Sequence, residues 1–261
     1  MILSPIEQSI KRKIEAVGTP LKDWDINIYR GVLTGCNEAF IITTEKRNEI
    51  LGNCQTEEER ERTRNVIRPI LRGRDIKRYG YEWAGLWLIA TFPSRHYDIE
   101  EYPAVKAYLM SFGIERLEQT GKKYVINGEE VKARKKTNNK WFETQDSINY
   151  WHDFLKPKLF YADITQHLNF CLCKEVMFCN NTTYFISAKD DSILEHLKVY
   201  LNSPLIDWYY RTLSVQLGES AVRMFSIYVL EIPIPPITQK DIYKAYSLNQ
   251  SEINYIENRN F

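Results

Sequence analysis

The chain has 261 residues, and its 35 lysine and arginine residues nearly balance 34 aspartate and glutamate residues, giving a formal net charge of +1. Hydrophobic residues make up 44% of the chain, with only 11 glycines and 10 prolines, which excludes collagen, low-complexity sequence and disorder. Charges break every apolar run before the roughly 18 residues that a membrane span needs. Five cysteines without framework spacing favour a reducing compartment. We expect a soluble cytoplasmic protein with no signal peptide and no membrane partner.

The first elements are a helix and two strands. Ser4-Pro5-Ile6-Glu7 is a capping box with proline at the first helical position, and apolar residues recur at helical spacing up to Gly18. Asp25–Tyr29 and Ala39–Thr43 are rich in β-branched and aromatic residues, which is typical of strands. The loop between these strands contains two glycines.

The middle of the sequence predicts a helix, a strand and a second helix, in that order. Thr56 and Glu59 form a second capping box, and its helix should end before Pro69. The aromatic and apolar run Trp83–Phe92 predicts a buried strand. Pro103 opens a helix with one apolar face.

The second half begins with a strand after Pro157. Phe170–Phe178 and Thr182–Ile186 predict a β-hairpin that turns at Asn180-Asn181. Three later segments are expected to be a helical pair, an extended segment whose prolines exclude a central strand, and a final helix: Asp190–Leu213, Leu230–Ile237 and Ser251–Asn258. The fold class is therefore α+β, with a β-rich portion up to about residue 187 and a C-terminal helical portion packed against it.

Enzymatic motifs are absent from this sequence. Neither glycine-rich phosphate loop nor the G-x-S-x-G motif occurs. Glu130-Val131-Lys132 has the E-x-K spacing of metal-dependent nucleases without the upstream P-D element, so a nuclease is a minor alternative. His167, Cys171, Cys173 and Cys179 fit no common zinc knuckle, and buried strand cysteines are the favoured interpretation. We expect no catalytic and no metal-binding residue.

Positive charge is concentrated in two segments. Residues 68–81 carry five arginines and lysines against one aspartate, and residues 121–140 carry seven against two glutamates, a local balance of +5. Such residues neutralise DNA phosphates, while arginine, lysine and asparagine also reach base edges. Charge alone favours a solvated face instead. In Arg72-Gly73-Arg74-Asp75, the aspartate can hold one guanidinium in a bidentate pair while the other faces phosphate or guanine.

Several strings carry a family resemblance. They are YRGVLTGCNEAFII from Tyr29, IRPILRGRDIKRY from Ile67, KPKL from Lys156, YLNSPLI from Tyr200 and LEIPIPP from Leu230. In this order they resemble the TaqI-like C-terminal specificity domain, the target-recognition module of adenine-specific DNA methyltransferases in type II restriction-modification enzymes, including fused methylase-endonucleases. The resemblance runs from about Tyr29 to about Ile237. The last string also resembles the closing segment of type I specificity subunits.

The resemblance implies a non-catalytic fragment whose β-rich portion grips double-stranded DNA. The partner would be a methyltransferase domain in the same parent chain that flips out adenine and methylates N6 with S-adenosylmethionine, and Mg²⁺ would serve a fused nuclease. This chain lacks the D/N-P-P-Y/F motif and binds no cofactor itself on this interpretation. It divides into an N-terminal helix and linker (1–24), a target-recognition domain (25–237) and a C-terminal helical tail (238–261).

The DNA-binding prediction combines three segments. They are the glycine turn at Thr34–Glu38, the arginine turn at Arg72–Asp75 and the basic loop at residues 121–140. The glycine turn is equally consistent with a purely structural role. The residues expected at DNA are Thr34, Gly35, Asn37, Arg72, Arg74, Lys77, Arg78, Lys132, Arg134, Lys135, Lys136, Asn138, Asn139 and Lys140. A stand-alone subunit that docks separate methylase and nuclease chains, as in type I systems, is the second hypothesis, although those subunits usually carry two recognition halves.

Overall fold

The structure is a computed structural model that describes residues 3–214, 216–218, 220–237 and 241–259. It is an α+β fold organised around a four-stranded antiparallel sheet in the order β12-β10-β14-β2. The bounds of these strands are Cys171–Cys173, Lys158–Ala162, Thr183–Ala188 and Ile26–Arg30. The predicted boundary at residue 238 lies outside the described residues.

The two faces of this central sheet belong to two different hydrophobic cores. Phe160, Phe185 and Tyr29 lie opposite one another in the register and face the first core. Leu159 and Ile186 are also paired and face the second core. Since successive side chains of a strand point to opposite faces, one sheet serves both cores.

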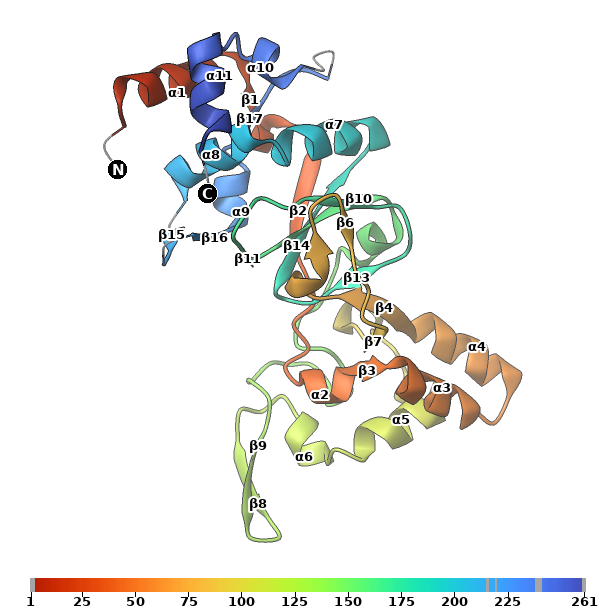
Figure 1. Ribbon diagram of the computed structural model, residues 1–261. Helices are drawn as coiled ribbons and strands as arrows, with labels where there is room; N and C mark the ends of the chain where they lie inside the picture. Colours follow the sequence, from red (N-terminus) through yellow and green to blue (C-terminus); the bar gives the residue numbers. More distant parts are fainter. Residues whose placement is uncertain (1–2, 215, 219, 238–240, 260–261) are drawn as a thin grey trace.

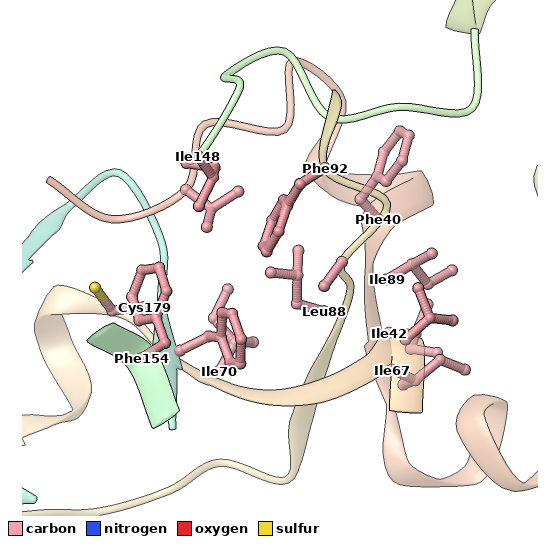
Figure 2. Packing of buried hydrophobic residues seen from close by; sticks show 14 of the residues in the cluster. Phe40, Ile42, Ile67, Ile70, Leu88, Ile89, Phe92, Ile148, Phe154 and Cys179 are labelled. Carbon is pink, nitrogen blue, oxygen red and sulfur yellow. The ribbon is translucent and has the colours of Figure 1, made fainter. Parts of the chain in front are cut away.

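The first core lies between the central sheet and a second sheet in the order β13-β4-β7-β3. Figure 2 shows Ile42, Ile70, Leu88, Phe154 and Cys179 among the side chains that fill it. The strands of this sheet are Phe178–Cys179, Ile67–Leu71, Leu86–Ile89 and Ile41–Thr43. Five helices accompany it: α2 (Asn37–Phe40), α3 (Thr44–Gly52), α4 (Glu57–Val66), α5 (Pro103–Met110) and α6 (Ile114–Leu117).

The second core is formed by helices from both ends of the chain (Figure 1). Ile10 and Ile14 enter it from the N-terminal helix, and Tyr246 and Ile256 enter it near the C-terminus. The elements are α1 (Pro5–Val17), α7 (Asp191–Leu201), α8 (Pro204–Leu213), α9 (Ser226–Val229), α10 (Ile242–Ala245), α11 (Gln250–Glu257) and the paired strands β1 (Thr19–Pro20) and β17 (Pro233–Ile234). All three predicted chain divisions therefore contribute to one core.

Three further sheets are small, and two of them contribute one buried residue each to the cores, Ile76 and Val222. Figure 1 shows β8 (Lys123–Ile126) and β9 (Glu129–Lys132) as a hairpin that extends from the end of the molecule opposite α1. The others are β5 (Ile76–Lys77) with β6 (Gly80–Tyr81), and β11 (Ile164–Thr165) with β16 (Ala221–Arg223) and β15 (Gln216–Leu217). Within the described ranges, no helix has the length and apolar character to cross a membrane.

Most helix predictions are confirmed, together with the strand after Pro157. The proline-rich segment forms no central strand, as predicted, and pairs only through β17 with β1. The Thr56 hydroxyl accepts a hydrogen bond from the Glu59 N–H at 3.1 Å, as its capping box requires. The helix predicted from Pro103 is α5. The helical pair after Asp190 is α7 and α8, and each begins at a side-chain cap.

The predicted hairpin at Asn180-Asn181 is wrong. β12 and β14 both pair with β10, while β13 leaves this sheet and pairs in parallel with β4. Strand pairing depends on partners distant in sequence, so a turn signal alone does not decide it. Two predicted strands are also shorter: β3 begins only at Ile41, after α2, and β7 covers only Leu86–Ile89.

Candidate nucleic-acid interface

The Thr34–Asn37 loop leads from β2 into α2. Thr34 is fully buried, and its hydroxyl donates to Asn37 Oδ1 at 2.7 Å and accepts from the Cys36 N–H at 3.1 Å. Gly35 has a φ of 78°, and a Cβ there would come within 2.9 Å of Gln145 Oε1. The loop therefore requires glycine. Thr34 itself is a structural residue, whereas Gly35 and Asn37 are exposed.

A second turn follows β4 and is held by an ion pair. The Arg72 guanidinium donates to both carboxylate oxygens of Asp75, at 3.0 and 2.8 Å, and the Arg72 N–H donates to the same carboxylate at 2.8 Å. Burial opposes the charge of Asp75, yet these hydrogen bonds hold its pKa below the usual value. Arg72 is thus the fixed arginine of the turn, and Arg74 is exposed.

Arg134 does not lie on the surface of the basic segment. Its side chain is buried, with 4% of the residue exposed. The guanidinium donates to four main-chain oxygens at 2.7 to 2.8 Å: those of Leu117, Thr34, Glu143 and Trp141. Burial lowers its pKa to about 10. The structure therefore does not present Arg134 for the predicted DNA contact: four of its five N–H donors are bonded to the main chain and join the basic loop to the Thr34–Asn37 loop.

Five of the residues predicted to contact DNA in the basic segment are exposed, four lysines and one asparagine. Lys132, Lys135, Lys136 and Lys140 are exposed, and in the described residues none has a carboxylate within 4 Å. Asn138 is exposed as well. Asn139 differs, because its amide donates to the main-chain oxygens of Thr144 and Gln145 at 3.3 and 2.9 Å and so closes the loop.

Two adjoining recesses bring the three segments together, and Asn37 lines both. The first recess, of about 550 Å³, includes Gly35, Glu38, Arg116, Lys132 and Lys135 in its lining. The second, of about 520 Å³, includes Arg72, Gly73, Arg74, Asp163, Asn180 and Thr182. Segments separated by about a hundred residues in the chain thus meet around Asn37. We call the exposed residues Asn37, Arg74, Lys132 and Lys135 the Asn37 surface.

Among the predicted residues of segment 68–81, two lie outside these recesses. Lys77 Nζ donates to the Arg74 main-chain oxygen at 3.1 Å and lies 3.6 Å from Glu82. Arg78 donates to the Asn202 main-chain oxygen at 3.2 Å and lines a separate recess beside α8. Arg78 therefore contacts the helical portion of the molecule.

The recesses also contain residues that the sequence did not single out. Arg116 forms an ion pair with Glu38 across the first recess. Asp163 lines the second, and its Oδ1 is buried with no hydrogen-bond partner among the described residues. The sequence predicts Asn180 in a hairpin turn and Thr182 at the start of the following strand, and this wrong hairpin does not place them beside Arg72. No local signal marks these residues, because each reaches the site through contacts between segments that are distant in sequence.

In the part of the chain that the structure describes, the residues considered for a nuclease or a zinc site are not assembled into one. No three His, Cys, Asp or Glu side chains gather there to hold a metal ion. Cys171, Cys173 and Cys179 are buried in the first core, as predicted, and burial raises the pKa of Cys171 to about 12. His167 is instead exposed beside Asp207. Glu130 pairs with Lys123 at 2.9 Å on the hairpin.

Similarity to solved structures identifies the fold. The chain resembles the type IIG restriction endonuclease BpuSI with a TM-score of 0.55 and 12% identity, over 97% of this chain and 28% of that one. It also resembles the type IIL restriction-modification enzyme MmeI, whose structure is a complex with DNA, with a TM-score of 0.51 and 15% identity, over 82% and 25% of the two chains. This chain spans about a quarter of the length of either enzyme. No curated protein matches the sequence.

These similarities show a fold that also occurs within restriction-modification enzymes. Residues 68–234, more than half of the chain, match the TaqI-like C-terminal specificity domain, and the chain belongs to this family. The predicted resemblance is confirmed over that range. The segment from Tyr29 to Ile67 lies outside the match, although its Asn37 lines both recesses.

Proposed function

We propose that this chain is the double-stranded DNA recognition part of a type II restriction-modification enzyme, with the Asn37 surface facing DNA. The observation that carries the proposal is the convergence of Arg74, Lys132 and Lys135 around one exposed asparagine, with no described carboxylate within 4 Å of these three cations. Lysines would neutralise phosphates. An asparagine amide can pair with adenine and an arginine with guanine, so Asn37 and Arg74 are the proposed base readers.

A charge-reversal experiment tests the phosphate contacts. The double variant Lys135→Glu, Lys136→Glu should weaken binding to a fluorescent duplex pool of randomised sequence at low salt. Fluorescence anisotropy measured across a salt series should also give a less steep dependence of affinity on salt. Lys22→Glu, Lys189→Glu makes the same charge change at exposed lysines outside both recesses. Equal loss in both double variants, or no loss in either, would contradict the proposal.

The rest of the parent enzyme is proposed to be an adenine-N6 methyltransferase. Its domain would supply the S-adenosylmethionine site and the pocket for the extruded adenine, and a fused nuclease would supply Mg²⁺. Support comes from the family to which the chain belongs and from the absence of an N-P-P-Y-type motif here. Such a motif upstream in the same reading frame is the expected finding. Methyl transfer to DNA by the purified 261-residue chain would contradict the division of labour.

A stand-alone type I-like specificity subunit is the second candidate. The only feature in its favour is the closing segment around β17, which resembles the closing segment of such subunits. Gel filtration with the products of neighbouring genes separates the two candidates, because a subunit of this kind would elute together with separate methylase and nuclease chains.

A further inference from the structure

A basic and aromatic pocket lies apart from the Asn37 surface and shares no lining residue with its two recesses. The pocket has a volume of about 380 Å³. Its polar wall contains Arg62 from α4, Arg68 from β4 and Arg95 from the turn before α5, and its floor includes Phe92 and Phe178 from the first core.

None of the three guanidinium groups forms an ion pair with a described carboxylate, although Glu58 and Glu61 act on Arg62 and Arg68 from a greater distance. Within the described ranges, no carboxylate lies within 4 Å of Arg62, Arg68 or Arg95, and no Asp or Glu lines the pocket. Arg64 on the same helix provides the contrast, since it pairs with Glu57 and Glu61 at 3.3 and 3.2 Å. Converging positive charges without counterions are a poor arrangement for stability, and a bound anion would remove the repulsion.

Neighbouring groups hold the arginines in place. Arg62 donates through Nε and Nη2 to the Glu101 main-chain oxygen, at 3.3 and 3.2 Å, and Arg68 donates to Asn65 Oδ1 at 3.3 Å. Arg95 lies 3.8 Å from the centre of the Trp151 ring. Each guanidinium has five N–H donors, so donors remain for a ligand. Burial lowers the pKa of Arg68, with a further contribution from the nearby charge of Arg95.

We propose that this pocket binds a phosphate group through Arg62, Arg68 and Arg95. A phosphate has several acceptor oxygens that match guanidinium forks, whereas a single carboxylate would neutralise only one of the three charges. The phosphate could belong to the DNA backbone or to a free phosphate compound. The DNA source rests on the proposed function. Arg68 lies on β4, and Arg72 follows four residues later, about 13 Å away along a strand. Since one turn of DNA spans about 34 Å, the pocket and the arginine turn are close enough to contact the same turn of a duplex.

The first experiment measures thermal unfolding of the 261-residue chain in inorganic phosphate, in chloride and in acetate at equal ionic strength. Phosphate at about ten times its dissociation constant should raise the midpoint by about 2 to 4 °C. Arg68→Gln and Arg95→Gln should each lose this rise, and Arg64→Gln should keep it. Arg95 is exposed, so its variant should fold even if Arg68→Gln does not. An equal rise in acetate, no rise in the unsubstituted chain, or an unchanged rise in Arg95→Gln would overturn the proposal.

The second experiment identifies the source. If the phosphate belongs to DNA, Arg95→Gln should reduce the salt slope of duplex binding by about 1, and Arg64→Gln should not. Loss of the phosphate effect in Arg95→Gln with an unchanged DNA slope would assign the pocket to a free phosphate compound. If the unsubstituted chain binds no DNA but keeps the phosphate effect, the proposed function fails while the pocket remains.

Discussion

Arg134 and Lys135 are neighbours in the most basic segment of the sequence, yet one side chain is enclosed and the other is exposed. Arg134 donates to four main-chain oxygens, while Lys135 lines a recess and has no carboxylate of the described residues within 4 Å. The arginine turn repeats this contrast, since Asp75 holds Arg72 and leaves Arg74 exposed. In both segments one cation holds the backbone in place through its hydrogen bonds, and a second cation is exposed on the same backbone. Fixed loops lower the ordering cost of binding.

The largest expected effect comes from removing the enclosed cation. Arg134→Met should lower the free energy of unfolding by about 3 to 5 kcal/mol, because several buried carbonyl groups lose their donor at once. Urea denaturation followed by circular dichroism measures this change. Lys135→Met, at the adjacent exposed position, should cost less than about 0.5 kcal/mol. If the two variants were equally stable, the claim that Arg134 stabilises the fold and Lys135 does not would be wrong.

The ion pair of the arginine turn should give a smaller effect that depends on pH. Asp75→Asn should cost about 1 to 2 kcal/mol at pH 7, because a charged acceptor of three hydrogen bonds is lost. The folded-state pKa of Asp75 lies below its unfolded value. Its contribution is therefore complete above the unfolded pKa, near 4, and disappears as the pH falls through the folded pKa.

Denaturation midpoints between pH 2 and pH 7 test this linkage. The difference between the unsubstituted chain and Asp75→Asn should shrink as the pH falls below about 4. Asp25→Asn provides a control at an exposed aspartate. A difference that stays constant over the acidic range would show that the Asp75 charge does not stabilise the turn.

How far the sequence predicts the site depends on the range of the interactions involved. The pairing of one arginine with Asp75 was predictable, because the partners lie three residues apart and a turn brings them together. The enclosure of Arg134 was not, since its acceptors come from Thr34, Leu117 and two residues after the basic segment. A single sequence shows the composition of a basic loop, but it does not show which side chain points inward.

The same limit applies to the fold. The α+β class and most helices follow from local capping and periodicity, and these signals act within one or two turns. The parallel pairing of β13 with β4 joins segments more than a hundred residues apart. This pairing places Asn180 beside the arginine turn, so the second recess could not be predicted once β13 had been assigned to a hairpin.

The smallest expected change in stability belongs to the exposed cations, and it is the one most closely connected to binding. Lys132→Gln should change the free energy of unfolding by less than about 0.5 kcal/mol, because the lysine is exposed at the end of β9 and no carboxylate in the described part of the chain lies within 4 Å of it. If it contacts one phosphate, the salt slope of duplex binding should fall by about 1. Anisotropy titrations across a salt series measure the slope, with Lys189→Gln as the matched control. A loss of stability comparable to that of Asp75→Asn, with an unchanged slope, would place Lys132 among the residues that fix the loops.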